Sequence, residues 1–184
     1  MKTIQSSFKT ALLLSTGLVA VAGLIFTIYG AVSPGQPSFD QVIKDNSKSM
    51  MAEGRQTFRF DTFGDEAFWG DTLQLHLAIE GANFGGVGAG LSPETALSLG
   101  LKVDVEMLSS AIIDQLKKNQ LNLSDPAVTL LLLKRNAVVG LTGFFNSNGS
   151  LRSVGISCSL CHSTVDNSLT FGIGHRLDGG RTAI

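Results

Sequence analysis

The stretch "AVVGLTGFFNSNGSLRSVGISCSLCH", residues 137–162, marks a change of pattern in this chain. The runs "AVVGLTGFF" and "SLRSVGIS" are rich in β-branched and aromatic residues, and "NSNG" lies between them. Asn-Gly between two such runs is typical of a tight β-turn. We therefore predict a β-hairpin over residues 137–157, which leads the chain to Cys158.

The sequence upstream of this hairpin carries helical patterns over residues 34–136. Ser92-Pro93 and Asp125-Pro126 are helix starts, because a capping side chain precedes proline at the first helical position. The glycine-rich segment 81–90 follows a predicted helix and not a strand, which favours a loop over a dinucleotide-binding turn. The predicted helices begin near Phe39, Asp61 or Thr62, Ser92, Asp104 and Asp125, and they end near Gly54, Gly81, Leu99, Leu121 and Asn136.

The N-terminal segment predicts export from the cytoplasm. Lys2 and Lys9 precede an uncharged apolar run at residues 11–32, which fits a signal peptide or an uncleaved membrane anchor. In either case the rest of the chain is expected in the periplasm or at the extracytoplasmic face of the inner membrane. We divide the chain into a signal or anchor segment (1–33), a helical region (34–136) and a hairpin with the cysteine-bearing segment (137–184). The formal charge of −1 and the lack of a basic patch argue against a nucleic-acid partner.

Both cysteines of the chain lie in the pentapeptide Cys158-Ser159-Leu160-Cys161-His162. Covalent haem attachment needs two thiols close together and a histidine beside them for the iron, and C-x-x-C-H supplies both. A closed zinc site needs four ligands, whereas the chain has only His76 and His175 outside the motif. A thioredoxin-like redox pair is expected in a βαβ unit, which the surrounding sequence does not resemble. Haem is favoured over zinc, a redox pair and coincidence.

These residues resemble the haem attachment motif of bacterial exported c-type cytochromes at Cys158, Cys161 and His162. The segments "VVGLTGFFNSNGSLRSVGISCSLCHSTVDNS" and "GRQTFRFDTFGDEAFWGDTLQLH" also look like parts of larger members. The resemblance implies covalently bound haem c, with His162 as an axial ligand of its iron, and helices packed around it. We therefore expect a mainly α, helical cytochrome c-like fold with one β-hairpin before the motif and an N-terminal anchor or signal. The protein is expected to bind metal through the haem iron. It is also expected to be transmembrane if the anchor is not cleaved.

The sixth ligand of the iron is the weak point of this resemblance. No methionine lies among the 22 residues that follow His162, so His175 and His76 are the candidate ligands. Arg152 and Arg176 flank the motif and are candidates for pairing with haem propionates. The tail after the motif shows no periodicity, and we expect the chain to be the N-terminal part of a longer cytochrome.

The function predicted from the sequence is transfer of single electrons between redox partner proteins. No catalytic residue is assigned, and an electron-transfer protein is favoured over a complete enzyme. The alternative is the haem-bearing part of a peroxidase- or dehydrogenase-like oxidoreductase, for which an open position on the iron would be required. A zinc-binding structural module is the remaining alternative.

Overall fold

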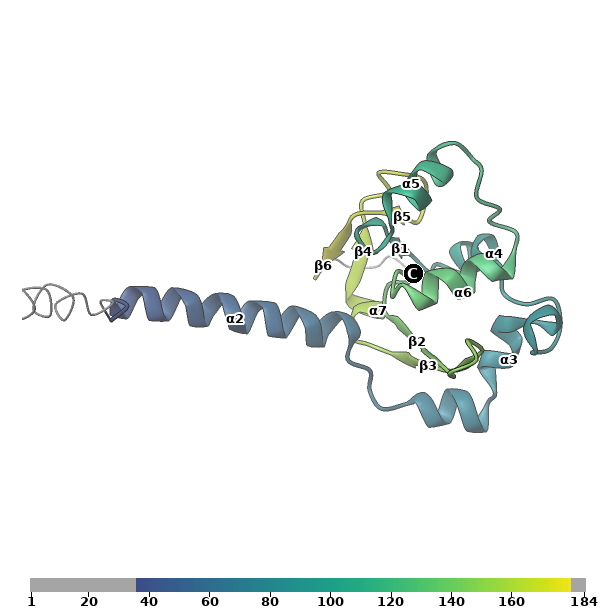
Figure 1. Cartoon of the computed structure of the whole chain (residues 1–184), viewed down its shortest axis with the longest axis horizontal. Coiled ribbons are helices and arrows are strands. Elements are labelled where there is room, and N and C mark those ends of the chain that lie inside the picture. Colours follow the sequence, from purple (N-terminus) through teal and green to yellow (C-terminus); the bar gives the residue numbers. More distant parts are fainter. Residues whose placement is uncertain (1–35, 180–184) are drawn as a thin grey trace, which may run out of the picture. The chain divides into compact units, whose positions relative to one another are not determined.

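The computed structural model describes residues 36–179, and it divides the chain into two compact units, Met1–Lys48 and Ser49–Ile184. The apolar run at residues 11–32, and with it the predicted signal or anchor, lies outside the described residues. Helix α2 (Phe39–Phe60) runs from the first unit into the second and is labelled in Figure 1. The second unit contains every other described element and the cysteine motif.

Helix α2 begins where the sequence predicts and ends later than predicted. The pattern indicates an end near Gly54, yet the helix continues to Phe60. An exposed glycine inside a helix costs only about 1 kcal/mol relative to alanine, and nothing lies within 4 Å of the position a Cβ would take at Gly54. The glycine therefore weakens the helix without ending it.

The other predicted helices are present with shorter or divided bounds. Ser92 Oγ accepts a hydrogen bond from Thr95 N, and Asp125 Oδ1 accepts one from Ala127 N, so both predicted caps are confirmed. The expected helix before Gly81 is split by Gln74, which adopts a left-handed conformation with φ 51°. The elements are a π-helical turn η1 (Phe68–Thr72), α3 (Leu75–Glu80), the 3-10 turn η2 (Ala82–Phe84), α4 (Pro93–Ser98), the 3-10 turn η3 (Val105–Met107), α5 (Ser110–Lys117) and α6 (Pro126–Lys134).

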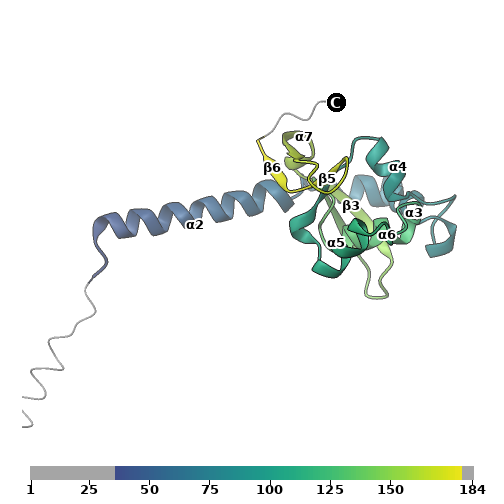
Figure 2. The ribbon, with the colours of Figure 1, turned by 90° about the horizontal axis from the view of Figure 1, so that it is seen from above.

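The predicted hairpin is confirmed as the antiparallel strands β2 (Leu141–Phe145) and β3 (Leu151–Ile156). Gly149 has φ 88°, the left-handed conformation that a glycine in this turn adopts without steric cost. In the pairing register Phe144 lies opposite Ser153, and Gly143 lies opposite Val154. Strand β3 contacts α3, both labelled in Figure 2, and strand β2 contacts α6.

The tail is more ordered than the sequence predicts. After β3 the chain forms α7 (Ser159–His162), β4 (Ser163–Val165), β5 (Ile173–Gly174) and β6 (Arg176–Asp178). Strand β4 pairs with β6, while β5 pairs in parallel with β1 (Val103–Asp104). These strands are too short to produce an alternating pattern in the sequence.

The predicted fold class is wrong. About 47% of the described residues are helical and 17% lie in strands, and the strands form three separate two-stranded sheets. Among residues 36–179 no helix is long and apolar enough to cross a membrane. The expected mainly helical cytochrome c-like fold with a single hairpin is therefore replaced, in the described part of the chain, by a mixture of helices and small sheets; the predicted membrane anchor lies outside that part.

The hydrophobic core joins the hairpin to the helices and to the tail. Leu151 and Ile173 are each 1% exposed, and they pack with the α6 residues Leu132 and Leu133. Burial of one such side chain stabilises the fold by about 1.5–3 kcal/mol. The tail is thus an integral part of the unit that carries the motif.

Candidate functional site

Cys158, Cys161 and His162 lie on one side of a short helical turn. Helix α7 spans Ser159–His162, and Cys158 is its N-cap with helical dihedral angles. Residues three and four apart on such a turn share a face, which places all three side chains together. Cys158 is half-buried, while Cys161 and His162 are exposed. The two thiols and the imidazole therefore share a face that is open to solvent.

The opposite side of this turn is fixed by two buried serines. Ser157 and Ser159 are 1% and 0% exposed, and their hydroxyl oxygens lie 2.8 Å apart. Both hydroxyls donate to the carbonyl oxygen of Arg59 in the last turn of α2, at 3.1 and 3.3 Å. These hydrogen bonds hold the inner side of the motif, which leaves the cysteines and the histidine on its outer side.

Gly140 allows the motif to pack directly on the chain that enters β2. A Cβ at Gly140 would lie 2.2 Å from the Cα of Leu160 and 2.3 Å from its amide nitrogen. Gly140 also has φ 80°, and its carbonyl oxygen accepts a hydrogen bond from Ser157 N at 3.0 Å. Its lack of a side chain is therefore required both by the backbone conformation and by the close approach of α7.

The chain after the motif is tied back by the β4–β6 pair. Gly179 N donates to the carbonyl oxygen of His162 at 2.8 Å, and Ser163 Oγ donates to Asp178 Oδ1 at 3.0 Å. Asp178 also accepts a hydrogen bond from Arg59 Nε at 2.8 Å. The motif is thus held between the end of α2 and strand β6.

A buried group of charged residues lies behind the motif. The Arg176 side chain is 1% exposed, and its Nε lies 3.1 Å from Asp178 Oδ1 without hydrogen-bond geometry. Burial lowers the pKa of Arg176, although the neighbouring Asp178 opposes this shift. Asp104 is fully buried, and burial raises the pKa of its carboxyl despite the hydrogen bond that it accepts from the amide of Glu106.

Asp178 responds to the same surroundings in the opposite direction. Burial acts to raise its pKa, but the hydrogen bonds from Arg59 and Ser163 outweigh burial and hold the pKa below its usual value. Asp178 is therefore stabilised in its charged form, whereas Asp104 is destabilised in that form.

The two other histidines do not lie beside His162 in this arrangement. His175 is exposed, and its Nδ1 lies 3.7 Å from Glu106 Oε1. Its carbonyl oxygen accepts a hydrogen bond from Asp166 N, just beyond the end of the β4–β6 ladder. Asp166 follows the last pair of that ladder, Val165 with Arg176, whereas His162 precedes the first pair, Ser163 with Asp178. His76 belongs to α3, is half-buried, and its Nδ1 has no hydrogen-bond partner among residues 36–179.

The two arginines also lie apart from the solvent-facing side of the motif. Arg152 is an exposed residue of β3 that lines a pocket on the hairpin. Arg176 is buried, and its guanidinium lies 5.8 Å from the centre of the Phe60 ring. Arg176 is therefore not exposed beside Cys161 and His162, and Arg152 belongs to the pocket on the hairpin.

The broader prediction of metal binding needs correction. Within the described range no group of three or more His, Cys, Asp or Glu side chains could hold a metal ion. A centre built from protein ligands, including the zinc module, is therefore not formed by this part of the chain. The transmembrane anchor was predicted at residues 11–32, which lie outside the described residues, and no described helix is long and apolar enough to cross a membrane.

No family model, curated protein or solved structure matches the chain. The function must follow from the residues of the site. The residues that hold the motif in place could not be found from the sequence, because a single buried serine or a close-packed glycine produces no spacing pattern. They are Arg59, Gly140, Ser157, Ser159 and Asp178.

Proposed function

We propose that this chain is an exported c-type cytochrome that carries one haem c on Cys158 and Cys161, with His162 as an axial ligand of its iron. It passes single electrons between redox partner proteins in the periplasm. The observation that carries the proposal is the shared, solvent-facing side of the motif, on which both thiols and the imidazole lie together.

The residues present fit the attachment of haem c. Thioether formation requires two thiols that reach one edge of the porphyrin, and helical i, i+3 spacing keeps Cys158 and Cys161 on one face. Both side chains are at least partly accessible, and the inner side of the turn is held by Ser157 and Ser159. The thiols and the imidazole are thus accessible without any change to these buried hydrogen bonds.

The bound haem supplies reversible one-electron chemistry, and the chain's own residues determine where that group is held. His162 stands at the end of α7, and its carbonyl oxygen is fixed by the hydrogen bond from Gly179. An exposed position is suited to electron carriers, because a partner protein can approach the haem edge closely. Exposure also influences the reduction potential of the iron.

The second axial position determines whether the iron of the carrier is open to small ligands or six-coordinate. His175 and His76 both lie away from the motif, which favours an iron that is open on one side. We therefore expect the ferrous protein to bind carbon monoxide, with a shift of its absorption bands. His175→Ala and His76→Ala should leave that shift unchanged.

Failure of the ferrous wild-type protein to bind carbon monoxide would identify a sixth ligand in the same experiment. A wild-type protein that ignores carbon monoxide while His175→Ala or His76→Ala binds it would show that the replaced histidine is the sixth ligand. This outcome would contradict the open position and favour a six-coordinate carrier.

Covalent attachment itself is tested by expression with the periplasmic haem-attachment machinery, denaturing electrophoresis and a haem stain. The wild-type band should stain, and the Cys158→Ala, Cys161→Ala double variant should not. Ser168→Ala is the matched control, because Ser168 is an exposed serine outside the motif. A wild-type band without stain would overturn the proposal.

A further inference from the structure

Two exposed apolar side chains border the cysteine motif, one at each end of it. Phe63 is 68% exposed and belongs to the segment that follows α2, and Leu177 is 49% exposed and belongs to β6. Phe63 N donates to the carbonyl oxygen of Ile156 at 2.9 Å, just before the motif. Leu177 is paired with Thr164, just after the motif. Backbone pairing thus brings two apolar groups to the motif from outside it.

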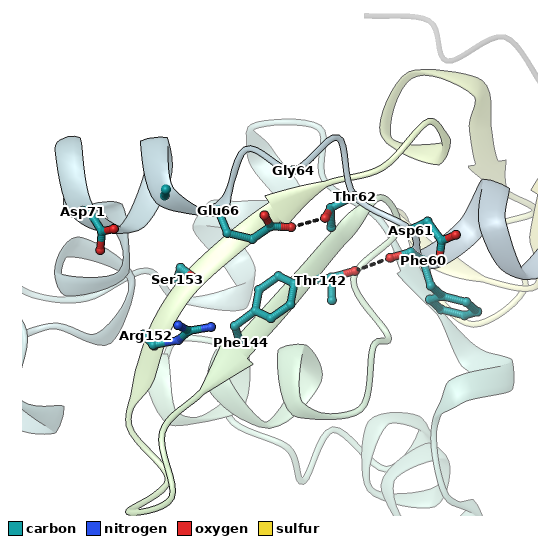
Figure 3. A pocket seen from close by; sticks show the side chains of 11 residues that line it. Phe60, Asp61, Thr62, Gly64, Glu66, Asp71, Thr142, Phe144, Arg152 and Ser153 are labelled. Carbon is teal, nitrogen blue, oxygen red and sulfur yellow. Dashed lines mark hydrogen bonds between the residues drawn. The ribbon is translucent and has the colours of Figure 1, made fainter.

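The pairing before the motif places Phe63 on the same side as Cys158. Thr62 and Ser157 form an antiparallel bridge, and a Cβ at Gly155 would lie 2.5 Å from Thr62 Cγ2. Figure 3 shows Thr62 beside the strands of the hairpin. The Thr62 side chain therefore lies on the side of Gly155 and of the inward hydroxyl of Ser157. Phe63 and Cys158 are the next residues of the two paired segments, and side chains alternate between faces, so both lie on the outer side.

The register of β4 and β6 places Leu177 on the same side as His162. Ser163 is 0% exposed, so its side of the ladder faces the interior. Its neighbour Thr164 and the paired Leu177 therefore face outward. The hydrogen bond from Gly179 N to the carbonyl oxygen of His162 extends the ladder by one pair. His162 is exposed, and it thus lies diagonally across from Leu177 on the outer side.

The motif therefore has apolar surface beside both Cys158 and His162. Diagonal neighbours in an antiparallel pair lie about 7–8 Å apart, within reach of aromatic and long side chains. Phe63 is diagonal to the cysteine, and Leu177 is diagonal to the histidine. One exposed apolar side chain is ordinary on a protein surface. Two of them beside the same motif are suited to a flat apolar group attached there, because covering them removes apolar surface from water.

We propose that Phe63 and Leu177 form a haem seat, in which both side chains pack on the porphyrin of the haem attached to Cys158 and Cys161. The inference rests on the proposed function and adds two contacts that the attachment motif does not contain. The occupant is the haem and not a partner protein, because covalent attachment fixes the haem at this point of the surface. By excluding water from the porphyrin, the haem seat raises the reduction potential of the iron.

Hydroxyl-radical footprinting tests whether the haem covers Phe63. X-ray radiolysis in water oxidises exposed side chains, and it is applied to the haem-bearing full chain and to the haem-free Cys158→Ala, Cys161→Ala variant. Phe63 should be oxidised several-fold more slowly in the haem-bearing protein, because contact with the porphyrin removes most of its accessible surface. Phe84 should be oxidised at the same rate in both proteins.

Phe84 is a matched control for Phe63. It is 40% exposed, and it lines a pocket with Asn148 and Gly149 at the turn of the hairpin, whereas the motif follows the other end of the hairpin. Trypsin cleaves after Arg59 and Lys102, so both phenylalanines are measured in one peptide, residues 60–102.

The outcomes separate the haem seat from haem attachment. A haem-bearing protein in which Phe63 is oxidised as fast as in the haem-free variant would overturn the haem seat and leave attachment intact. A wild-type band without haem stain would overturn both. Protection of Phe63 that increases with protein concentration would assign this side chain to an interface between copies of the chain and would also overturn the haem seat.

Leu177→Ser tests the second residue of the haem seat by potentiometry. The haem-bearing variant should have a lower reduction potential than wild type, because water at the porphyrin stabilises the more highly charged ferric state. Introduced into the haem-free variant, the same substitution should leave the melting temperature unchanged. Leu99→Ser is the matched control, because Leu99 is 74% exposed at the C-terminal end of α4, outside the haem seat. An unchanged potential in Leu177→Ser, or an equal decrease in Leu99→Ser, would remove Leu177 from the haem seat.

Discussion

Replacing Gly140 with alanine is expected to loosen the segment that carries the cysteines, because the new methyl group has no room. Its Cβ would lie 2.2 Å from Leu160 Cα and 2.5 Å from Leu160 Cβ, so backbone would have to move. The φ of 80° adds a cost of about 1–2 kcal/mol for a residue with a Cβ. Overpacking adds about 1–3 kcal/mol. We expect a total loss of roughly 2–5 kcal/mol in the free energy of unfolding.

Gly88 provides a control that isolates the steric part of this loss. It has φ 72°, and nothing lies within 4 Å of the position that its Cβ would take. Gly88→Ala should therefore show only the conformational cost, partly offset by the lower entropy of the unfolded chain, a net of about 1 kcal/mol.

Urea unfolding followed by circular dichroism compares the two variants directly. At a typical slope of about 2 kcal/mol per molar urea, an extra loss of about 2 kcal/mol lowers the midpoint by about 1 M. Similar midpoints for Gly140→Ala and Gly88→Ala would refute the close packing of α7 on Gly140. They would also mean that this packing does not orient the motif.

Three further predictions concern carboxylates that accept hydrogen bonds. Asp178 has a lowered pKa, so its contribution to stability is present above its unfolded pKa of about 3.9 and is lost as pH falls. Because the Asp178 side chain is 27% exposed, solvent screens its ion pairs. Urea unfolding should therefore show Asp178→Asn about 1 kcal/mol less stable than wild type at pH 7, with the difference disappearing in acid. Asp104 has a raised pKa, so its contribution to stability is lost as pH rises. Asp104→Asn should therefore equal or exceed wild type in stability at pH 7. A clear loss of stability in this variant at pH 7 would contradict the raised pKa. Glu80 is 3% exposed and accepts a hydrogen bond from the amide of Leu151 at 2.6 Å. Glu80→Ala should therefore lower the free energy of unfolding by about 1–3 kcal/mol in the same assay. An unchanged free energy of unfolding would refute the role of Glu80 as acceptor for this amide.

Local chemistry explains which parts of the fold were predictable from the sequence. The caps at Ser92 and Asp125 and the turn at Gly149 depend on residues within a few positions, and all three are confirmed. The end of α2 was misplaced because solvent exposure makes Gly54 tolerable. Short-range patterns thus locate starts and turns more reliably than ends.

The tail was missed because its order depends on distant segments. Ile173 pairs with Val103, and Asp178 is bound by Arg59, more than 100 residues earlier in the chain. Strands of two or three residues give no alternation that could be recognised beforehand. The sequence of a mixed fold therefore suggested a mainly helical one.

The candidate site likewise contains residues that the sequence predicts and residues that only the structure shows. Cys158, Cys161 and His162 were found because their spacing alone encodes a chemistry. The hydrogen bonds from Ser157 and Ser159 to Arg59 span about 100 residues and leave no such pattern. The places of Phe63 and Leu177 beside the motif were also missed, since they depend on backbone pairing that forms only in the folded chain.

Mass spectrometry of the tryptic peptide that spans residues 153–176 tests the central claim most directly. Trypsin cleaves after Arg152 and Arg176, so this one peptide contains both cysteines and His162. From protein made with the haem-attachment machinery, we predict a peptide heavier by one haem, with neither thiol open to alkylation. A peptide without haem, whose two thiols are alkylated or joined in a disulfide, would contradict covalent haem attachment at Cys158 and Cys161.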